Sequence, residues 1–233
     1  MDIKQNQELK SNSLFEQFQQ RLQEQANPTR AAQQQAYMKS AMPFYGVTKP
    51  AVDELCKALL KNHIPADATE YRATLLYFFE HATHRELWYV ALTYAQQHKT
   101  YITTNNIDVF IAIIRKAQWW DIIDTVAPNL IGKALSKSPL LNEYTMLWIQ
   151  DHNMWVRRTA LLAQLKYKQA TDLALQEKLI VTVAHEKEFF IRKAIGWSLR
   201  ELSKTNKDAV RGIIATHGEK LSGLSVREAR KYL

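Results

Sequence analysis

The carboxyl-terminal half of the sequence contains a repeat with a period of 35 residues. The segments WVRRTALLAQL, FIRKAIGWSL and SVREARKYL align so that a branched apolar residue, an arginine and, two positions later, a small residue recur. The aligned positions are Val156, Ile191 and Val226; Arg157, Arg192 and Arg227; and Thr159, Ala194 and Ala229. Such a period indicates one supersecondary unit that is copied and stacked, each copy burying its apolar face against the next.

The composition predicts that this unit is built of helices. Only 6 glycines and 6 prolines interrupt 233 residues, and the segments between them are rich in residues that favour helix. We therefore predict an all-α protein, an α-solenoid of HEAT-like helical repeats whose concave face offers regularly spaced side chains to a long, curved partner, a description that duplex DNA fits; an irregular helical bundle is the alternative. The length fits a single domain, 1–233, with amino-terminal helices in 1–45 and stacked repeats in 46–233.

Local signals place the first helices. Ser13 and Glu16 have the spacing of a capping box, which predicts that a helix begins there. Asn27 followed by Pro28 predicts a second helix start, and Pro50 a third. The first of these helices would bury one apolar stripe, formed by Leu14, Phe15, Phe18 and Leu22.

The stretch RKAQWWDIIDTVAP, residues 115–128, is predicted to form a helix with an unusual composition. Trp120 and Asp124 are four residues apart, so they would share one face of it, one turn from each other. Trp119 and Asp121 would point elsewhere and serve packing and solubility. The alternative is that both tryptophans belong to the core and both aspartates are solvated.

Two residues depart from the repeat. Arg157 recurs at equivalent positions, which indicates a structural role, whereas Arg158 is replaced by Lys193 and Glu228 in the other copies. Trp197 follows a glycine and aligns with Leu162 and Tyr232. Arg158 and Trp197 are therefore candidate functional residues, although a tryptophan taken alone is more often buried for structural reasons.

Charge and chemistry point to a polyanionic partner. The chain carries 31 lysines and arginines against 23 aspartates and glutamates, with a net charge of +8, which favours nucleic acid. Indole faces attract cations, arginine binds phosphate, and a carboxylate stabilises an oxocarbenium-like transition state. A cationic alkylated purine leaves as a neutral base without an acid, so one aspartate would suffice.

The residues together resemble a known family. The segments FYGVTKP, WWDIIDTVAP, WVRRTALLAQLKYK and FFIRKAIGWSLRE are similar to signature segments of the DNA alkylation repair glycosylases of AlkD type, and the likeness runs from about Tyr37 to the carboxyl terminus. The resemblance implies HEAT-like repeats around DNA and excision of cationic purines such as 3-methyladenine and 7-methylguanine. By motif, it implies that Trp120 and Trp197 line the lesion, that Asp124 is the catalytic carboxylate, and that Arg158 and Tyr37 contact DNA.

The first hypothesis is thus a monofunctional DNA glycosylase for base excision repair, acting without cofactor or metal on double-stranded DNA that contains alkylated bases. We expect a monomer that associates with the nucleoid through DNA binding. We expect it to be cytoplasmic, because no apolar run reaches the length of a membrane span and the start lacks a signal peptide. Cys56 is the single cysteine, so no internal disulfide is expected. His81 and His84 are read as a surface pair rather than a metal site.

The second hypothesis is a non-catalytic HEAT-like scaffold that binds DNA or a protein partner. A solenoid fold by itself supports nothing more specific. The two hypotheses differ in what they require of Trp120, Asp124, Arg158 and Trp197: the enzyme needs them to converge on one groove, and the scaffold does not.

Overall fold

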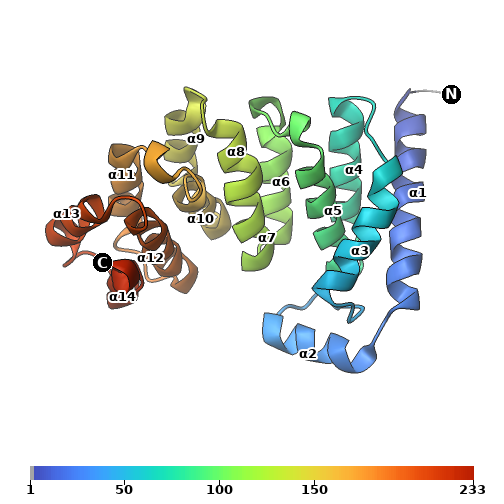
Figure 1. Ribbon diagram of the computed structural model, residues 1–233, viewed down its shortest axis with the longest axis horizontal. Helices are drawn as coiled ribbons and strands as arrows, with labels where there is room; N and C mark the ends of the chain where they lie inside the picture. Colours follow the sequence, from blue (N-terminus) through green and yellow to red (C-terminus); the bar gives the residue numbers. More distant parts are fainter. Residues whose placement is uncertain (1–2) are drawn as a thin grey trace. The chain divides into compact units, whose positions relative to one another are not determined.

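A computed structural model describes residues 3–233, with side chains from Lys10 onward. The described residues form helices joined by short connections and contain no β-strand (Figure 1). They divide into two compact units, one that ends at Ile102 and one that spans Thr103–Leu233. The predicted all-α helical repeat fold is confirmed, whereas the single domain with a division near residue 45 stays a prediction.

In its described part, from residue 3 onward, the first unit contains five α-helices with short 3-10 turns after the third and fifth. The helices are α1 (Ile3–Glu24), α2 (Pro28–Met38), α3 (Lys49–Leu59), α4 (Ala68–His81) and α5 (Arg85–Gln97), and the turns are Leu60–Asn62 and Lys99–Tyr101.

The second unit begins with a 3-10 turn, Thr104–Asn106, and continues with pairs of helices. The α-helices are α6 (Ile107–Ala117), α7 (Trp120–Val126), α8 (Gly132–Leu135), α9 (Leu140–Trp148), α10 (Met154–Leu162), α11 (Leu173–Val183), α12 (Phe189–Ser203), α13 (Lys207–His217) and α14 (Gly223–Ala229). A π-helical turn, Ala127–Ile131, links α7 to α8, and 3-10 turns lie at Lys168–Ala170 and Arg230–Tyr232.

The helix starts in the first unit test the predicted caps. The Asn27 side chain accepts a hydrogen bond from the backbone N–H of Arg30 and Pro28 opens α2, as predicted. The capping box at Ser13 is wrong, because α1 begins at Ile3 and Ser13 lies inside it. The third helix begins at Lys49, capped by Thr48, so Pro50 is its second residue.

The apolar stripe of α1 is confirmed as part of the core. Its four members are between 0% and 6% exposed, and Phe15 packs edge-on against Phe78 of α4 with ring centroids 5.2 Å apart. A shift of one residue along the helix would turn these side chains toward solvent. Their burial therefore confirms which face of α1 packs against the core, although the helix begins further upstream than predicted.

The FYGVTKP segment is held by a buried carboxylate. Glu86, 1% exposed at the start of α5, accepts hydrogen bonds from the backbone N–H groups of Tyr45, Gly46 and Val47 at 3.0, 2.9 and 3.2 Å. Gly46 has φ +83, and a Cβ there would lie 2.2 Å from the carbonyl oxygen of Asn27. Only glycine fits this position, so this part of the motif serves the fold.

In the second unit, corresponding helices of successive repeats stack. Helix α10 packs between α7 and α12, and α12 packs against α14; we call α7, α8, α10, α12 and α14 the second-helix row (Figure 1). The first helices, α9, α11 and α13, contact one another in the same order. The repeat positions predicted from sequence are buried: the three small residues are 0% exposed, as are Val156 and Ile191, whereas Val226 is half-buried.

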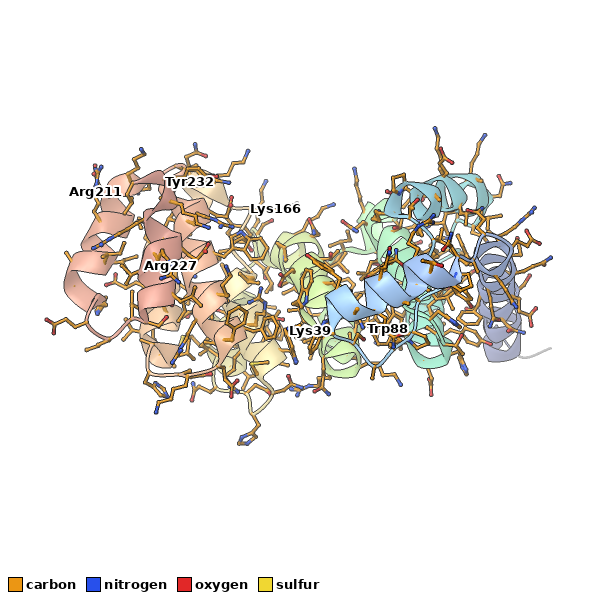
Figure 2. The ribbon with its side chains drawn as sticks, turned by 90° about the horizontal axis from the view of Figure 1, so that it is seen from below. Lys39, Trp88, Lys166, Arg211, Arg227 and Tyr232 are labelled. Atoms are coloured by element: carbon orange, nitrogen blue, oxygen red, sulfur yellow. The ribbon has the colours of Figure 1, made fainter. Side chains whose placement is uncertain are left out.

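The repeat arginines have the structural role predicted for them in two copies. Arg157 donates to the carbonyl oxygen of Asp151 at 2.7 Å, and Arg192 donates to that of Glu186 at 3.2 Å, six residues upstream in each case. Arg157 also forms a two-point ion pair with the carboxylate of Glu186. Arg227 is exposed (Figure 2).

Among the described residues, none of the helices has the length and apolarity required to cross a bilayer. The thiol of Cys56 is 1% exposed, and burial raises its pKa to about 11. A thiol that stays protonated at neutral pH is a poor nucleophile.

Candidate functional site

The site begins with a break in the stretch 115–128. Gln118 has φ 42 and ends α6, and Trp119 is extended and precedes the first residue of α7. The prediction of one helix over residues 115–128 is therefore wrong. A left-handed residue resets the direction of the chain, and Pro128, which lacks an N–H donor, lies in the π-helical turn that carries the helix onward into α8.

Trp120 and Asp124 nevertheless share a helix, as predicted. Both belong to α7, one turn apart, and both are half-buried. Because side chains four residues apart on a helix lie on the same face, the indole and the carboxylate point to the same side of α7.

Asp124 is paired with Arg158 of the neighbouring helix α10. Arg158 donates from Nε to Oδ1 at 2.8 Å and from an Nη to Oδ2 at 2.9 Å, which is the two-point geometry of a strong arginine–carboxylate pair. The sequence separated these residues by 34 positions and placed them in different motifs. The structure joins them directly.

The arginine is fixed from a third helix as well. Its other Nη donates to the backbone carbonyl of Phe190, at the start of α12, and its guanidinium lies 5.8 Å from the centroid of the Phe190 ring. Arg158 is only 4% exposed. One side chain thus ties α7, α10 and α12 together at the site.

An aromatic cluster packs beside Arg158. The ring centroids of Trp155 and Phe190 are 4.8 Å apart, and that of Trp119 lies 5.9 Å from each. The predicted packing role of Trp119 is confirmed. Asp121 is half-buried rather than fully solvated.

The carboxylate of Asp124 is partly shielded from water. Burial raises the pKa of Asp124 above its ordinary value, and the hydrogen bonds and charge of Arg158 oppose that rise without cancelling it. The negative charge of Asp121 adds to the increase. The side chain of Asp124 is still 20% exposed, so it is reachable from solvent.

Trp197 lies on α12 and is half-buried. It is seven residues from Phe190, so the two side chains share one face of the helix, two turns apart. The preceding residue, Gly196, is in close contact with α14, where a Cβ would lie 2.6 Å from that of Glu228. The glycine serves helix packing, and the indole beside it stays partly open.

Tyr37 belongs to the first unit, near the end of α2, and is 77% exposed. Lys39 ends this helix with φ 50. The two histidines singled out in sequence both contact tyrosine rings: His84 stacks on Tyr45 with ring centroids 3.8 Å apart, and His81 lies tilted against Tyr77 at 4.2 Å.

Two residues that stabilise the structure were not singled out from the sequence. The carbonyl and ring of Phe190 complete the surroundings of Arg158; its alignment with Trp155 in the repeat is the signal that could have indicated an aromatic contact between copies. Glu86 carried no motif, and its role depends on a loop 40 residues away.

Fold and site together define a helical repeat protein with a paired, partly accessible carboxylate, a half-buried indole on the same face of α7 and a second half-buried indole on α12. The family model of the DNA alkylation repair enzymes matches residues 18–233, and the chain belongs to this family. It is therefore a DNA repair enzyme.

A solved structure described as a predicted DNA alkylation repair enzyme from Enterococcus faecalis is similar to this chain. The two share 35% sequence identity and superpose with a TM-score of 0.82, over 89% of this chain and 96% of the other. No curated protein is significantly similar to the chain.

Proposed function

We propose that the protein is a monofunctional DNA glycosylase that hydrolyses the N-glycosidic bond of positively charged alkylated purines in double-stranded DNA. The observation that carries this proposal is the Asp124 carboxylate, held in two-point contact by Arg158 and 20% exposed beside Trp120. The family membership supports DNA as the substrate.

The chemistry follows from the charge of the substrate. As the bond between the deoxyribose C1′ and the purine nitrogen breaks, its electron pair goes to the cationic base, which leaves neutral and needs no proton. Positive charge then develops on the sugar, and the ionised carboxylate of Asp124 stabilises it. Water adds to C1′ and loses a proton to give the abasic site.

The neighbouring groups have complementary roles. Trp120 and Trp197 offer indole faces to the cationic base and its sugar. Arg158 has five N–H donors, of which the bonds to Asp124 and Phe190 use three. The remaining donors would bind the phosphate next to the lesion, while the first bonds keep Asp124 in position. Tyr37, in the first unit, would contact DNA elsewhere.

The direct test is release of 7-methylguanine from methylated duplex DNA by the purified protein in the presence of EDTA. Asp124→Asn should lower single-turnover release by about 10²- to 10³-fold, the usual loss when one transition-state contact is removed. Binding to undamaged duplex should stay within about two-fold, because the proposed phosphate contacts remain.

Asp121→Asn, on the same helix, is the matched control. It removes the same charge one turn away and should leave release nearly unchanged. Equal rates for the wild type and Asp124→Asn would contradict the role given to Asp124, and absence of release by the wild type would contradict the glycosylase activity itself.

A further inference from the structure

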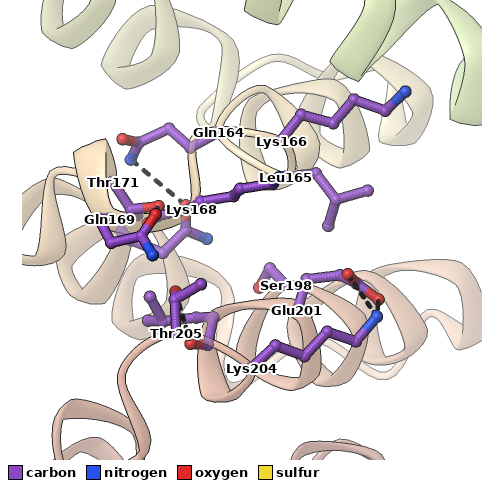
Figure 3. Close-up of a pocket in the computed structure, with 12 residues that line it drawn as sticks. Gln164, Leu165, Lys166, Lys168, Gln169, Thr171, Ser198, Glu201, Lys204 and Thr205 are labelled. Carbon is purple, nitrogen blue, oxygen red and sulfur yellow. Dashed lines mark hydrogen bonds and ion pairs between the residues drawn. The ribbon is translucent and has the colours of Figure 1, made fainter.

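A second feature of the second unit lies along the carboxyl ends of α8, α10 and α12, starting about one turn beyond Asp124. A cavity of about 600 Å³ opens between the segment that follows α10, the start of α11 and the end of α12. Figure 3 shows Gln164, Gln169 and Thr171 on one side of it, and Glu201, Lys204 and Thr205 on the other.

A neighbouring hollow continues this cavity along the row. It has a volume of about 360 Å³ and is lined by Pro128, Asn129, Lys133, Ser136, Lys166 and Tyr167. Lys166, labelled in Figure 2, lines both hollows, and its ammonium donates to Asn129 at 2.6 Å. We call the two hollows together the lysine groove.

The groove carries a marked excess of positive charge. Lysines 133, 166, 168 and 204 line it, against a single carboxylate, Glu201, which pairs with Lys204. Among the residues that the structure describes, no side chain pairs with the ammonium of Lys133 or Lys168, and Lys166 has only a neutral amide. Each of three successive repeats supplies at least one of these lysines.

Helix capping alone does not account for this arrangement. Lysines near helix carboxyl ends commonly bind the last carbonyl groups, but here Lys166 binds a side-chain amide and Lys204 a carboxylate. Lys168 occupies the left-handed region with φ 54, which is costly for a residue other than glycine or asparagine. Helix capping also does not explain why these lysines surround a cavity.

We propose that the lysine groove binds the phosphodiester backbone of DNA, as a contact surface separate from the Asp124–Arg158 pair. Along α12, Phe190 at the site and Lys204 at the groove are 14 residues apart, or about 21 Å at the helical rise. A duplex that crosses the second-helix row would meet both. This inference rests on DNA being the substrate, but it does not require base excision.

Salt-dependent binding to an undamaged duplex tests the groove. Lys133→Gln combined with Lys168→Asn removes the two unpaired charges, and asparagine tolerates the left-handed conformation. The slope of log affinity against log salt should become less steep by about 0.9 for each lost phosphate contact, about 1.8 in all. Affinity at low salt should fall about ten-fold.

The control is Lys178→Gln combined with Lys207→Gln, which removes two exposed charges from α11 and α13 of the same unit. This variant should keep the wild-type slope. Equal loss of slope in both double variants would mean that the groove contributes only net charge, and would overturn the proposal. Thermal unfolding of each variant verifies that it is folded.

A second arm separates a DNA backbone from a free phosphate compound. Amide chemical shifts of Lys168, Gln169 and Thr171 should move on titration with duplex at low salt, and move far less with inorganic phosphate or adenosine monophosphate at the same phosphate concentration. Saturable shifts with the small phosphates alone would overturn the assignment to DNA. A reduced slope in a protein that releases no base would uphold the groove and refute only the glycosylase.

Discussion

The two units use an acidic side chain in opposite ways. In the first unit Glu86 is 1% exposed and accepts hydrogen bonds from three backbone N–H groups of one loop. In the second unit the Asp124 side chain is 20% exposed and is bound by one arginine. A carboxylate whose oxygens are all occupied by backbone N–H groups stabilises the fold. A carboxylate bound by a single cation remains partly accessible to a ligand.

The largest expected effect is on the stability of the first unit. Glu86→Gln replaces one acceptor oxygen by an N–H₂ group that faces a backbone donor, so at least one buried N–H loses its partner. We expect a loss of about 2–4 kcal/mol in the free energy of unfolding, measured by urea denaturation.

Asp124→Asn should lower the free energy of unfolding by less than Glu86→Gln does, which sharpens the comparison: Arg158 loses its charged partner but keeps its bond to the Phe190 carbonyl. The pKa of Asp124 is raised in the folded protein, so at neutral pH its ionisation is less favourable than in the unfolded chain and its charge does not stabilise the fold. Equal destabilisation by the two substitutions would break the distinction between the carboxylates.

The next effect is on the pH dependence of base release. Because burial raises the pKa of Asp124, release should fall on acidification at a pH above the ordinary pKa of aspartate, as the carboxylate becomes protonated. Arg158 lowers this pKa, so Arg158→Gln should move the acid limb of the single-turnover rate to higher pH. Arg158→Lys, which keeps the charge, should move it less. An unmoved limb would mean that Arg158 does not act on Asp124.

A smaller effect on stability is expected at a glycine that helix packing requires, and it distinguishes this glycine from one that packing does not require. At Gly196 a Cβ would lie 2.6 Å from the Glu228 Cβ and 3.0 Å from the Ser225 carbonyl oxygen. Gly196→Ala should therefore force α12 and α14 apart and lower the free energy of unfolding by about 1–3 kcal/mol. Release should weaken as well if the position of Trp197 depends on this contact.

The smallest effect has the opposite sign. Gly212 lies inside α13, and nothing would meet a Cβ there within 4 Å. Gly212→Ala should raise the free energy of unfolding by about 0.5–1 kcal/mol, because glycine is the poorer helix former. Urea denaturation of the two alanine variants side by side checks both signs.

The sequence predicted those features that repeat or that depend on near neighbours. The 35-residue period identified apolar and small-residue positions that are buried except for the half-buried Val226, because stacked copies bury equivalent side chains. Asn27 with Pro28 marked a real helix start because capping acts within one turn. The capping-box motif at Ser13 misled, because the same residues fit inside a longer helix.

The failures concern conformations and contacts that distant residues impose. Gln118 adopts a left-handed conformation that its residue type does not favour, so no local pattern announced the break before α7. The predictions for Trp120 and Asp124 as neighbours on one face held because helical periodicity is local. The pairing of Asp124 with Arg158 depends on how α7 stacks on α10. The lysine groove depends on how the ends of helices from three repeats come together.

The contacts of Arg157 have a consequence for the way in which the second unit opens. This residue holds the turn of its own repeat through Asp151 and the turn of the next through Glu186. Fraying of one repeat would therefore break bonds that belong to its neighbour, which couples the two in folding. Native-state hydrogen exchange should show α10 and α12 opening as one cooperative unit, so that Arg158 and Trp197 are assembled or lost together.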